Sequence, residues 1–162
     1  MLTHIPDDLV PFAIFGVGGV MLIIIMLIHG FGLDRIVDRY KRRAARMRQE
    51  CWHPKPAVFI FAGTIFLMLL LHSIEIWLWS ALLYAGGLVE NIHRAAYFSA
   101  NAYTTLGMGS MVLPYNWHEL SPMIAISGLF TFAWTTSEMF NIVGSQHDLV
   151  DELTAKREHK PL

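Results

Sequence analysis

A long run without charge most constrains this chain, because it fixes the kind of environment in which the chain can fold. From Leu9 to Leu33 no Asp, Glu, Lys or Arg occurs. A helix that crosses a membrane needs about 20 consecutive apolar residues, and this run is long enough. It follows two acidic residues, Asp7 and Asp8, rather than a basic segment, and no small-residue cleavage pattern comes after it. These features differ from those of a signal peptide, so we expect a retained first membrane span.

Two further apolar segments, from Ala57 to about Leu83 and from about Ser121 to Gly144, predict a second and a third span. Hydrophobic residues make up 54% of the chain and charged residues only 15%, against about 25% charged in a soluble domain. The sequence therefore predicts an all-α integral membrane protein with three transmembrane helices. We expect an extra N-terminal span over residues 1–32 and a short cytoplasmic tail over residues 145–162.

A strongly basic segment, residues 33–56, separates the first two apolar runs. Its apolar residues recur at helical spacing, and Lys and Arg cover the rest of the surface, which is typical of a helix lying among lipid headgroups. We expect a basic amphipathic helix on the cytoplasmic surface that contacts anionic headgroups, and no nucleic acid as partner. The prolines Pro54 and Pro56 should end it. The predicted stripe consists of Leu33, Ile36, Val37, Tyr40, Ala44, Met47 and Cys51.

The distribution of positive charge predicts the orientation. Of the 12 Lys and Arg residues, all but Arg94 lie in the basic segment or in the C-terminal tail. Basic residues next to membrane spans concentrate on the cytoplasmic side. We therefore expect the N-terminus outside and the C-terminus in the cytoplasm, in what would be a bacterial inner membrane.

Between the second and third apolar segments lies a stretch with a different pattern. Residues Ile92 to Tyr103 predict a short helix, and the sequence Thr104-Thr105-Leu106-Gly107-Met108-Gly109-Ser110 follows it. Glycines at alternate positions permit backbone angles that turn successive carbonyls toward one axis. A flexible turn between helices would explain the glycines equally simply. However, non-helical backbone at membrane depth is tolerated only where it is buried in protein or lines a water-filled cavity, which favours a pore.

This order of span, short helix, Thr-Thr-aliphatic-Gly-X-Gly and span resembles the pore unit of the potassium channel family over about residues 57–144. The resemblance implies an outer helix, a re-entrant pore helix, a selectivity filter and an inner helix. It also implies a homotetramer, because rings of carbonyl oxygens from four chains replace the hydration shell of an ion. The implied ion-binding residues are Thr105, Leu106, Gly107, Met108 and Gly109, supported by Thr104, Ser110, Asn101, Tyr97 and Phe98.

Three filter residues differ from the family's usual pattern. Leu106 replaces Val, Met108 replaces an aromatic residue and Ser110 replaces Asp. The pore-helix Glu that pairs with that Asp in some members is Asn101 here, so a Ser110–Asn101 hydrogen bond could brace the filter instead. The carbonyl ligands do not depend on an aromatic side chain, so we expect preference for potassium with a reduced margin. A weakly selective monovalent cation channel is the alternative.

In the third apolar segment, Gly128 lies one position from a hinge glycine that is frequent in the family, and a packing glycine is the other interpretation. Glu138 falls near the cytoplasmic end, where four carboxylates would concentrate cations. Phe132, Thr135 and Glu138 are therefore expected, with Gly128, to form the inner pore or gate.

His72 and Glu75 lie inside the second apolar segment, on one helical face. A buried structural hydrogen bond, pH sensing and a metal or proton site are the interpretations, and two residues are too few for a metal. We expect no metal beyond potassium, no other cofactor and no enzymatic activity. From a different class, a haem-binding three-span membrane anchor could use His29 and His72 as axial ligands, and a non-conducting assembly subunit is a further alternative.

Overall fold

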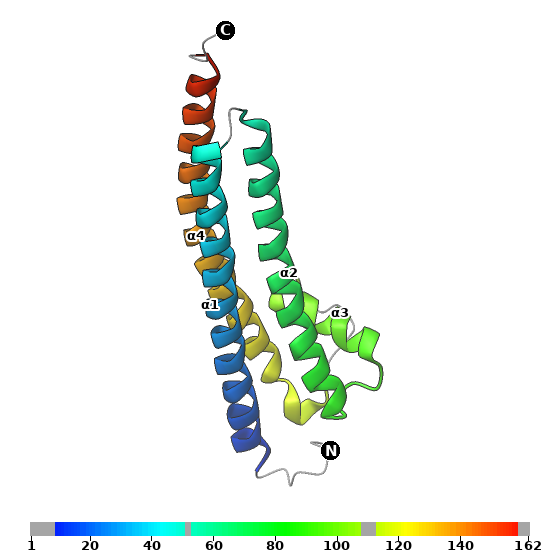
Figure 1. Ribbon diagram of the computed structural model, residues 1–162. Helices are drawn as coiled ribbons and strands as arrows, with labels where there is room; N and C mark the ends of the chain where they lie inside the picture. The colour runs from blue at the N-terminus through cyan, green and yellow to red at the C-terminus, as the bar shows by residue number, and fades with distance from the viewer. Residues whose placement is uncertain (1–8, 51–52, 108–112, 159–162) are drawn as a thin grey trace. The chain divides into compact units, whose positions relative to one another are not determined.

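The computed structural model describes residues 9–50, 53–107 and 113–158 of the 162-residue chain. The elements are α1 (Val10–Glu50), α2 (Lys55–Ala85), α3 (Ile92–Tyr103), the 3₁₀ helix η2 (Tyr115–Trp117) and α4 (Leu120–Glu158) (Figure 1). The described residues contain no strand. The predicted all-α fold is therefore confirmed.

Two of the described helices, α1 and α2, are long and apolar enough to cross a membrane. The third predicted span lies in α4, which does not meet the same standard of length and hydropathy within the described residues. The physical reason is visible in the sequence, because Thr135, Thr136, Ser137 and Glu138 interrupt the apolar part of α4. The number of spans stays a prediction.

One compact unit contains residues 9–29, 72–107 and 113–132, and it includes the whole of α3. Its core is built from large side chains that are almost fully buried, including Trp79 of α2, Phe98 and Tyr103 of α3, and Ile124 of α4. The indole N–H of Trp79 donates to the hydroxyl of Ser127 at 2.9 Å, so the polar atom of this buried ring is satisfied. The short helix α3 is thus an integral part of this core.

The second compact unit contains residues 30–50, 53–71 and 133–158, and in it the basic segment differs from the prediction. No separate surface helix begins at residue 33, because α1 continues without a break to Glu50. The interval from Leu33 to Glu50 contains neither Gly nor Pro, so nothing in it stops a helix. The expected tail is helical over residues 145–158, since α4 continues to Glu158.

The apolar stripe of the basic segment packs inside this unit. Tyr40 donates a hydrogen bond to Oε1 of Gln146 at 3.1 Å, and both residues are buried. Nearer the end of α1, Arg48 lies 3.1 Å from the carboxylate of Glu152. The stripe therefore contacts α4 through Tyr40, and a contact of the basic segment with anionic headgroups stays a prediction. Its buried members are Leu33, Val37, Tyr40, Ala44 and Met47.

Candidate functional site

The short helix α3 has the bounds that the sequence predicts, Ile92 to Tyr103. Its first turn is capped by Asn91, whose side-chain oxygen accepts a hydrogen bond from the backbone N–H of His93 at 2.8 Å. This is the capping arrangement expected for Asn at a helix start. At 12 residues, α3 is about 18 Å long, too short to cross a hydrocarbon layer of about 30 Å.

The C-terminal end of α3 passes directly into the predicted filter. The N–H of Leu106 donates to the carbonyl of Asn101 and the N–H of Thr105 donates to the carbonyl of Ala102, both at 3.0 Å. These two bonds form a Schellman motif, in which the residue at C′ takes a left-handed conformation. That residue is Thr105, with φ of 56°. A β-branched residue in this position is strained, because its Cβ crowds the backbone.

Beyond this motif, Gly107 also has a positive φ, of 98°. Positive φ at alternate residues, Thr105 and Gly107, turns the backbone away from a regular strand. Residues Thr104 to Gly107 are all exposed, with Leu106 at 79%. The remaining predicted filter residues, Met108, Gly109 and Ser110, lie outside the described part of the chain.

The predicted supporting residues on α3 separate into two environments. Phe98 is buried in the core, whereas Tyr97 is 62% exposed in the single chain. Adjacent positions on a helix point about 100° apart, which places only one of them against the core. Asn101 is buried, and its amide N–H donates to the carbonyl of Tyr97 at 2.7 Å. Its predicted partner Ser110 lies outside the described residues.

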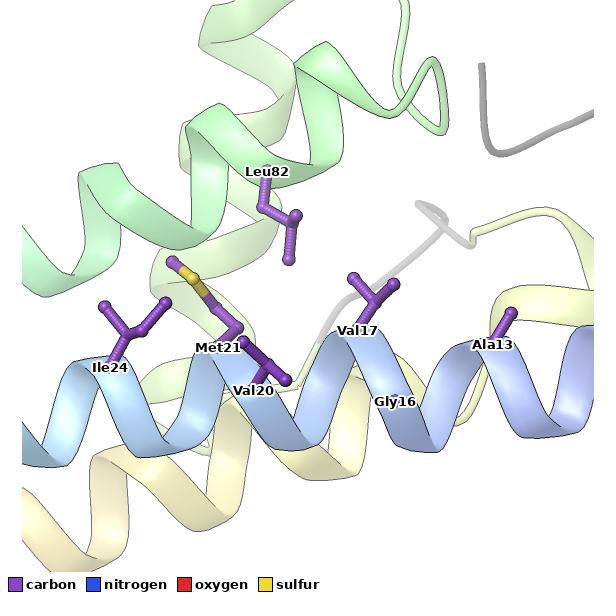
Figure 2. Close-up of a pocket in the computed structure, with 7 residues that line it drawn as sticks. All are labelled: Ala13, Gly16, Val17, Val20, Met21, Ile24 and Leu82. Atoms are coloured by element: carbon purple, nitrogen blue, oxygen red, sulfur yellow. The ribbon is translucent and has the colours of Figure 1, made fainter.

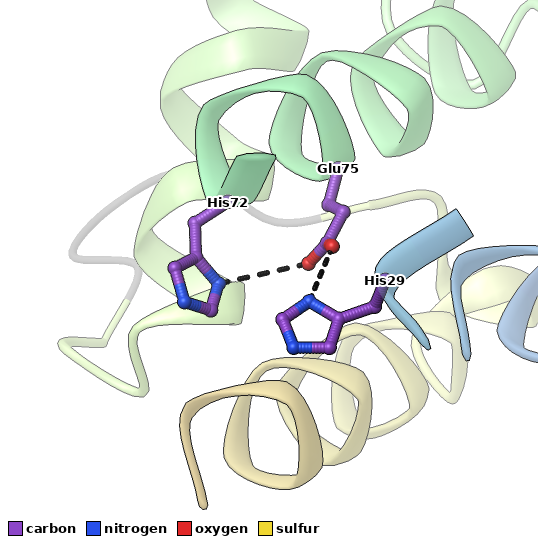
Figure 3. Close-up of side chains that lie close together, drawn as sticks. All are labelled: His29, His72 and Glu75. Atoms are coloured by element: carbon purple, nitrogen blue, oxygen red, sulfur yellow. Dashed lines mark hydrogen bonds and ion pairs between the residues drawn. The ribbon is translucent and has the colours of Figure 1, made fainter. Parts of the chain in front are cut away.

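A buried polar cluster lies beside the end of α3, and it extends the pair that the sequence indicated. His29 of α1 donates from Nδ1 to Oε1 of Glu75 at 2.7 Å, and Nδ1 of His72 is 3.7 Å from Oε2 of the same carboxylate (Figure 3). The ligand atoms of these three residues lie within 4.8 Å of one another. His29 and Glu75 are fully buried and His72 nearly so. We define these three residues as the His-Glu cluster.

Tyr103, the last residue of α3, connects the His-Glu cluster to the predicted filter. Its phenol donates to Oε2 of Glu75 at 2.5 Å and lies 2.8 Å from Nδ1 of His72. On the opposite side the phenol oxygen is 2.6 Å from the hydroxyl of Thr131 on α4. Polar groups inside an apolar environment require partners, so α1, α2, α3 and α4 each contribute one side chain or more to this network.

The sequence indicated His29 only as a possible haem ligand, and it did not indicate Tyr103 or Thr131 as members of this network. One signal could have found the connection between His29 and Glu75. Both residues interrupt apolar runs, and a carboxylate in such a run needs a buried partner from another helix. Tyr103 carries no such signal, because a tyrosine next to an apolar segment is common.

Gly128 contacts the backbone at the end of α3. A Cβ at this position would lie 2.0 Å from the carbonyl oxygen of Tyr103. Real Cβ atoms do not approach so closely, so the glycine allows α4 to reach the backbone of α3. Of the two interpretations, packing describes what Gly128 does here, and its role as a hinge stays a prediction. One helical turn after Gly128, the ring of Phe132 contacts the polar network. Its ring centroid lies 4.5 Å from that of His72.

The two predicted inner-pore residues of the second unit are both half-buried. Oε2 of Glu138 accepts a hydrogen bond from Nδ2 of Asn141 at 3.5 Å, one turn along α4. Thr135 also has an interaction partner. A pore lining by these residues depends on neighbouring chains and stays a prediction.

A pocket of about 470 Å³ lies on the first unit, between α1 and the end of α2 (Figure 2). Only apolar side chains and one glycine surround it, and no group there can act as an acid, a base or a metal ligand. The pocket therefore offers no chemistry of its own. It is lined by Ala13, Gly16, Val17, Val20, Met21, Ile24 and Leu82.

Comparison with known proteins found no matching family model, no matching curated protein and no matching solved structure. The function therefore has to be argued from the residues and their geometry.

Proposed function

We propose that four copies of this chain form a membrane channel for monovalent cations that prefers potassium. The carbonyl oxygens of Thr105 to Gly109 and the hydroxyl of Thr105 would coordinate the ion, in rings of four around one axis. The chain performs no chemistry in this proposal.

The anchoring of Tyr103 is the observation that carries the proposal. This residue ends a helix too short to span a membrane, and the exposed, irregular backbone of Thr104 to Gly107 begins directly after it. Glu75 holds its side chain from α2, and Thr131 lies against it from α4. A filter requires such an arrangement, because its carbonyls must stay in place without regular secondary structure of their own.

Exposed apolar side chains on both long helices support a membrane location. Phe59 on α2 is 78% exposed, and Phe12 on α1 is 77% exposed. Soluble monomers rarely expose large contiguous apolar surfaces, whereas lipid and neighbouring chains would cover them. Further exposed residues of this kind are Phe15, Val20, Ile23, Leu27 and Phe31 on α1, and Val58, Phe66, Leu69 and Leu70 on α2.

The proposed orientation rests on the positions of the basic residues in the sequence. All but one of the 12 Lys and Arg residues lie in the basic segment or in the C-terminal tail. With these residues in the cytoplasm, the loop between the second and third spans, which holds the proposed filter, would face outward.

Potassium flux from liposomes that contain the purified tetramer tests the proposal. Gly107→Ala should abolish the flux, because alanine is strained at a φ of 98° and its methyl group would stand among the carbonyls. Gly63→Ala is the matched control, since Gly63 lies in α2 with no atom within 4 Å of an added Cβ. Equal flux through both variants, or no flux through the unmodified protein, would contradict a pore at Gly107.

Reversal potentials in mixed sodium and potassium then measure selectivity. A preference for potassium supports the proposal in full. Equal permeability to sodium and potassium would refute the preference for potassium and leave an unselective cation channel. This result is expected if the rigid size of the filter, rather than the number of ligands, governs selectivity.

A further inference from the structure

We infer that the His-Glu cluster is a binding site for a zinc-like transition-metal dication. The three side chains belong to two helices, since His29 comes from α1 and His72 and Glu75 from α2. Two residues on one helix could not hold an ion on their own. The structure supplies the third ligand from a position 43 or more residues away in the sequence, which is why the sequence alone argued against a metal.

The ligand set matches what zinc uses in proteins. Two imidazoles and one carboxylate form a known zinc ligand combination, which leaves a fourth position for another group. Zn–N and Zn–O bonds of about 2.0–2.2 Å place tetrahedral ligands roughly 3.3 Å apart. The observed separations bracket this value, at 2.7 Å from His29 Nδ1 to Glu75 Oε1 and 3.7 Å from His72 Nδ1 to Glu75 Oε2.

The phenol oxygen of Tyr103 would lie at the fourth coordination position of the metal or next to a ligand that fills it. This oxygen is 2.5 Å from Glu75 Oε2 and 2.8 Å from His72 Nδ1. It would therefore either complete the coordination or hold the carboxylate in place by a hydrogen bond. Outer partners of this second kind typically contribute 10- to 100-fold to metal affinity.

Burial and charge favour a cation at this place. The carboxylate of Glu75 is fully buried, and in the described part of the chain its partners are His29, His72 and Tyr103 rather than Lys or Arg. Buried charges in proteins are paired or coordinate metals, because an isolated carboxylate is costly to remove from water. A dication would also fasten α1 to α2 next to Tyr103, which gives the additional N-terminal helix a physical connection to the residue that precedes the filter.

Metal content of the purified full-length protein tests this inference without any measurement of flux. After removal of metal by chelator, loading with Zn²⁺ and gel filtration, we expect one zinc per chain. His29→Gln and His72→Gln should each lower the zinc affinity at least 10-fold, since glutamine keeps a hydrogen-bonding group but is a poor zinc ligand. His147→Gln on α4 is the matched control for adventitious binding, because His147 is an exposed histidine, and it should leave the zinc content unchanged.

A measurement on the unmodified protein covers the case in which a cluster variant does not fold. Loading with Co²⁺ should give the intense visible absorption of a four-coordinate site, and Tyr103→Phe should shift that spectrum if the phenol is a ligand. An unshifted spectrum with 10- to 100-fold weaker binding would show that Tyr103 is not a ligand but holds the carboxylate of Glu75 by a hydrogen bond. That result would also support the metal site. Two results would overturn the metal site. One is the weak spectrum of six-coordinate cobalt, and the other is equal zinc retention in His29→Gln, His72→Gln and the unmodified chain. Absence of potassium flux would not overturn it, since the site does not rest on the proposed channel.

Discussion

Tyr103 and Glu75 are 28 residues apart in the sequence, and the phenol of one donates a hydrogen bond to the carboxylate of the other at 2.5 Å. Both side chains are fully buried. Glu75 also accepts from His29, so one carboxylate fixes the end of α3 and a position in α1 at the same time. The residues that follow Tyr103 are the exposed Thr104 to Gly107. The position of this irregular backbone therefore depends on a buried interaction behind it.

Removal of the phenol tests this dependence. Tyr103→Phe should lower the free energy of unfolding by about 1–3 kcal/mol, because it leaves a buried carboxylate oxygen without its donor. Thermal unfolding in mild detergent measures the change. Tyr97→Phe is the matched control on the same helix, since Tyr97 is exposed and its loss should cost less than about 0.5 kcal/mol. Equal effects of the two substitutions would show that the hydrogen bond to Glu75 does not stabilise the fold.

Gly128 gives a second test of the end of α3. Gly128→Ala would place a methyl carbon 2.0 Å from the carbonyl oxygen of Tyr103, and a backbone atom cannot rotate away as a side chain can. We expect a loss of about 1–3 kcal/mol or more in the free energy of unfolding. Gly144→Ala in the same helix is the control.

That control should have the opposite sign. No atom lies within 4 Å of a Cβ added at Gly144, so alanine only improves helix propensity there, by up to about 1 kcal/mol. If Gly128→Ala unfolds at the same temperature as Gly144→Ala, the close approach of α4 to α3 is wrong.

The sequence predicted local structure well where local chemistry decides it. The bounds of α3 agree with those predicted, and Asn91, a residue type that favours helix starts, directly precedes it. The separate surface helix at residues 33–56 did not form as predicted, because an apolar stripe at helical spacing shows only that one face is covered. Whether lipid or α4 covers it is a property of the tertiary fold.

The candidate site illustrates the same limit at the level of single residues. His72 and Glu75 were identified because polar groups in an apolar helix are costly wherever they lie. His29 carried the same signal, as a polar residue in another apolar run, whereas Tyr103 carried none, because its contacts depend on how the helices pack. The positive φ of Thr105 was hidden as well, since a β-branched residue rarely adopts it and no local pattern predicts it.

Packing of the basic segment against α4 predicts the effect of changes at Tyr40 and Gln146. Tyr40→Phe should lower the free energy of unfolding by about 1 kcal/mol, because the buried amide oxygen of Gln146 loses its donor. Gln146→Leu alone should cost a similar amount.

The double variant separates this contact from general perturbation. With both partners replaced, no buried polar group is left unsatisfied, so Tyr40→Phe with Gln146→Leu should cost less than the sum of the two single changes. Chemical denaturation of the four proteins gives the coupling. Strict additivity would indicate that the basic segment does not contact α4 and lies elsewhere, for example among lipid headgroups.

Charge at the inner end of the proposed pore predicts a change in conduction. Glu138→Gln should lower single-channel conductance or weaken block by cytosolic multivalent cations, because four carboxylates near the pore concentrate cations. Asp151→Asn is the control, an exposed carboxylate further along α4. If Glu138→Gln changes neither conductance nor block, Glu138 serves its hydrogen bond with Asn141 instead of the pore.

The Schellman motif at the start of the proposed filter predicts opposite effects at two adjacent threonines. Thr105 has a φ of 56°, which costs a β-branched residue about 1–2 kcal/mol. Glycine removes that strain but loses more conformational entropy on folding, about 0.5–1 kcal/mol. Thr105→Gly should therefore raise the free energy of unfolding by up to about 1 kcal/mol.

At Thr104 the φ is −86°, and the hydroxyl donates to the carbonyl of Ala100 at 2.7 Å. Glycine there relieves no strain and removes a hydrogen bond, so Thr104→Gly should lower the free energy by about 1 kcal/mol. Thermal unfolding of the two variants measures both signs. If Thr105→Gly is also destabilising, the left-handed conformation at Thr105 is absent from the folded protein. If Thr105→Gly is stabilising but changes potassium flux, the hydroxyl or the strain at this position serves conduction, as an ion ligand in the proposed filter would.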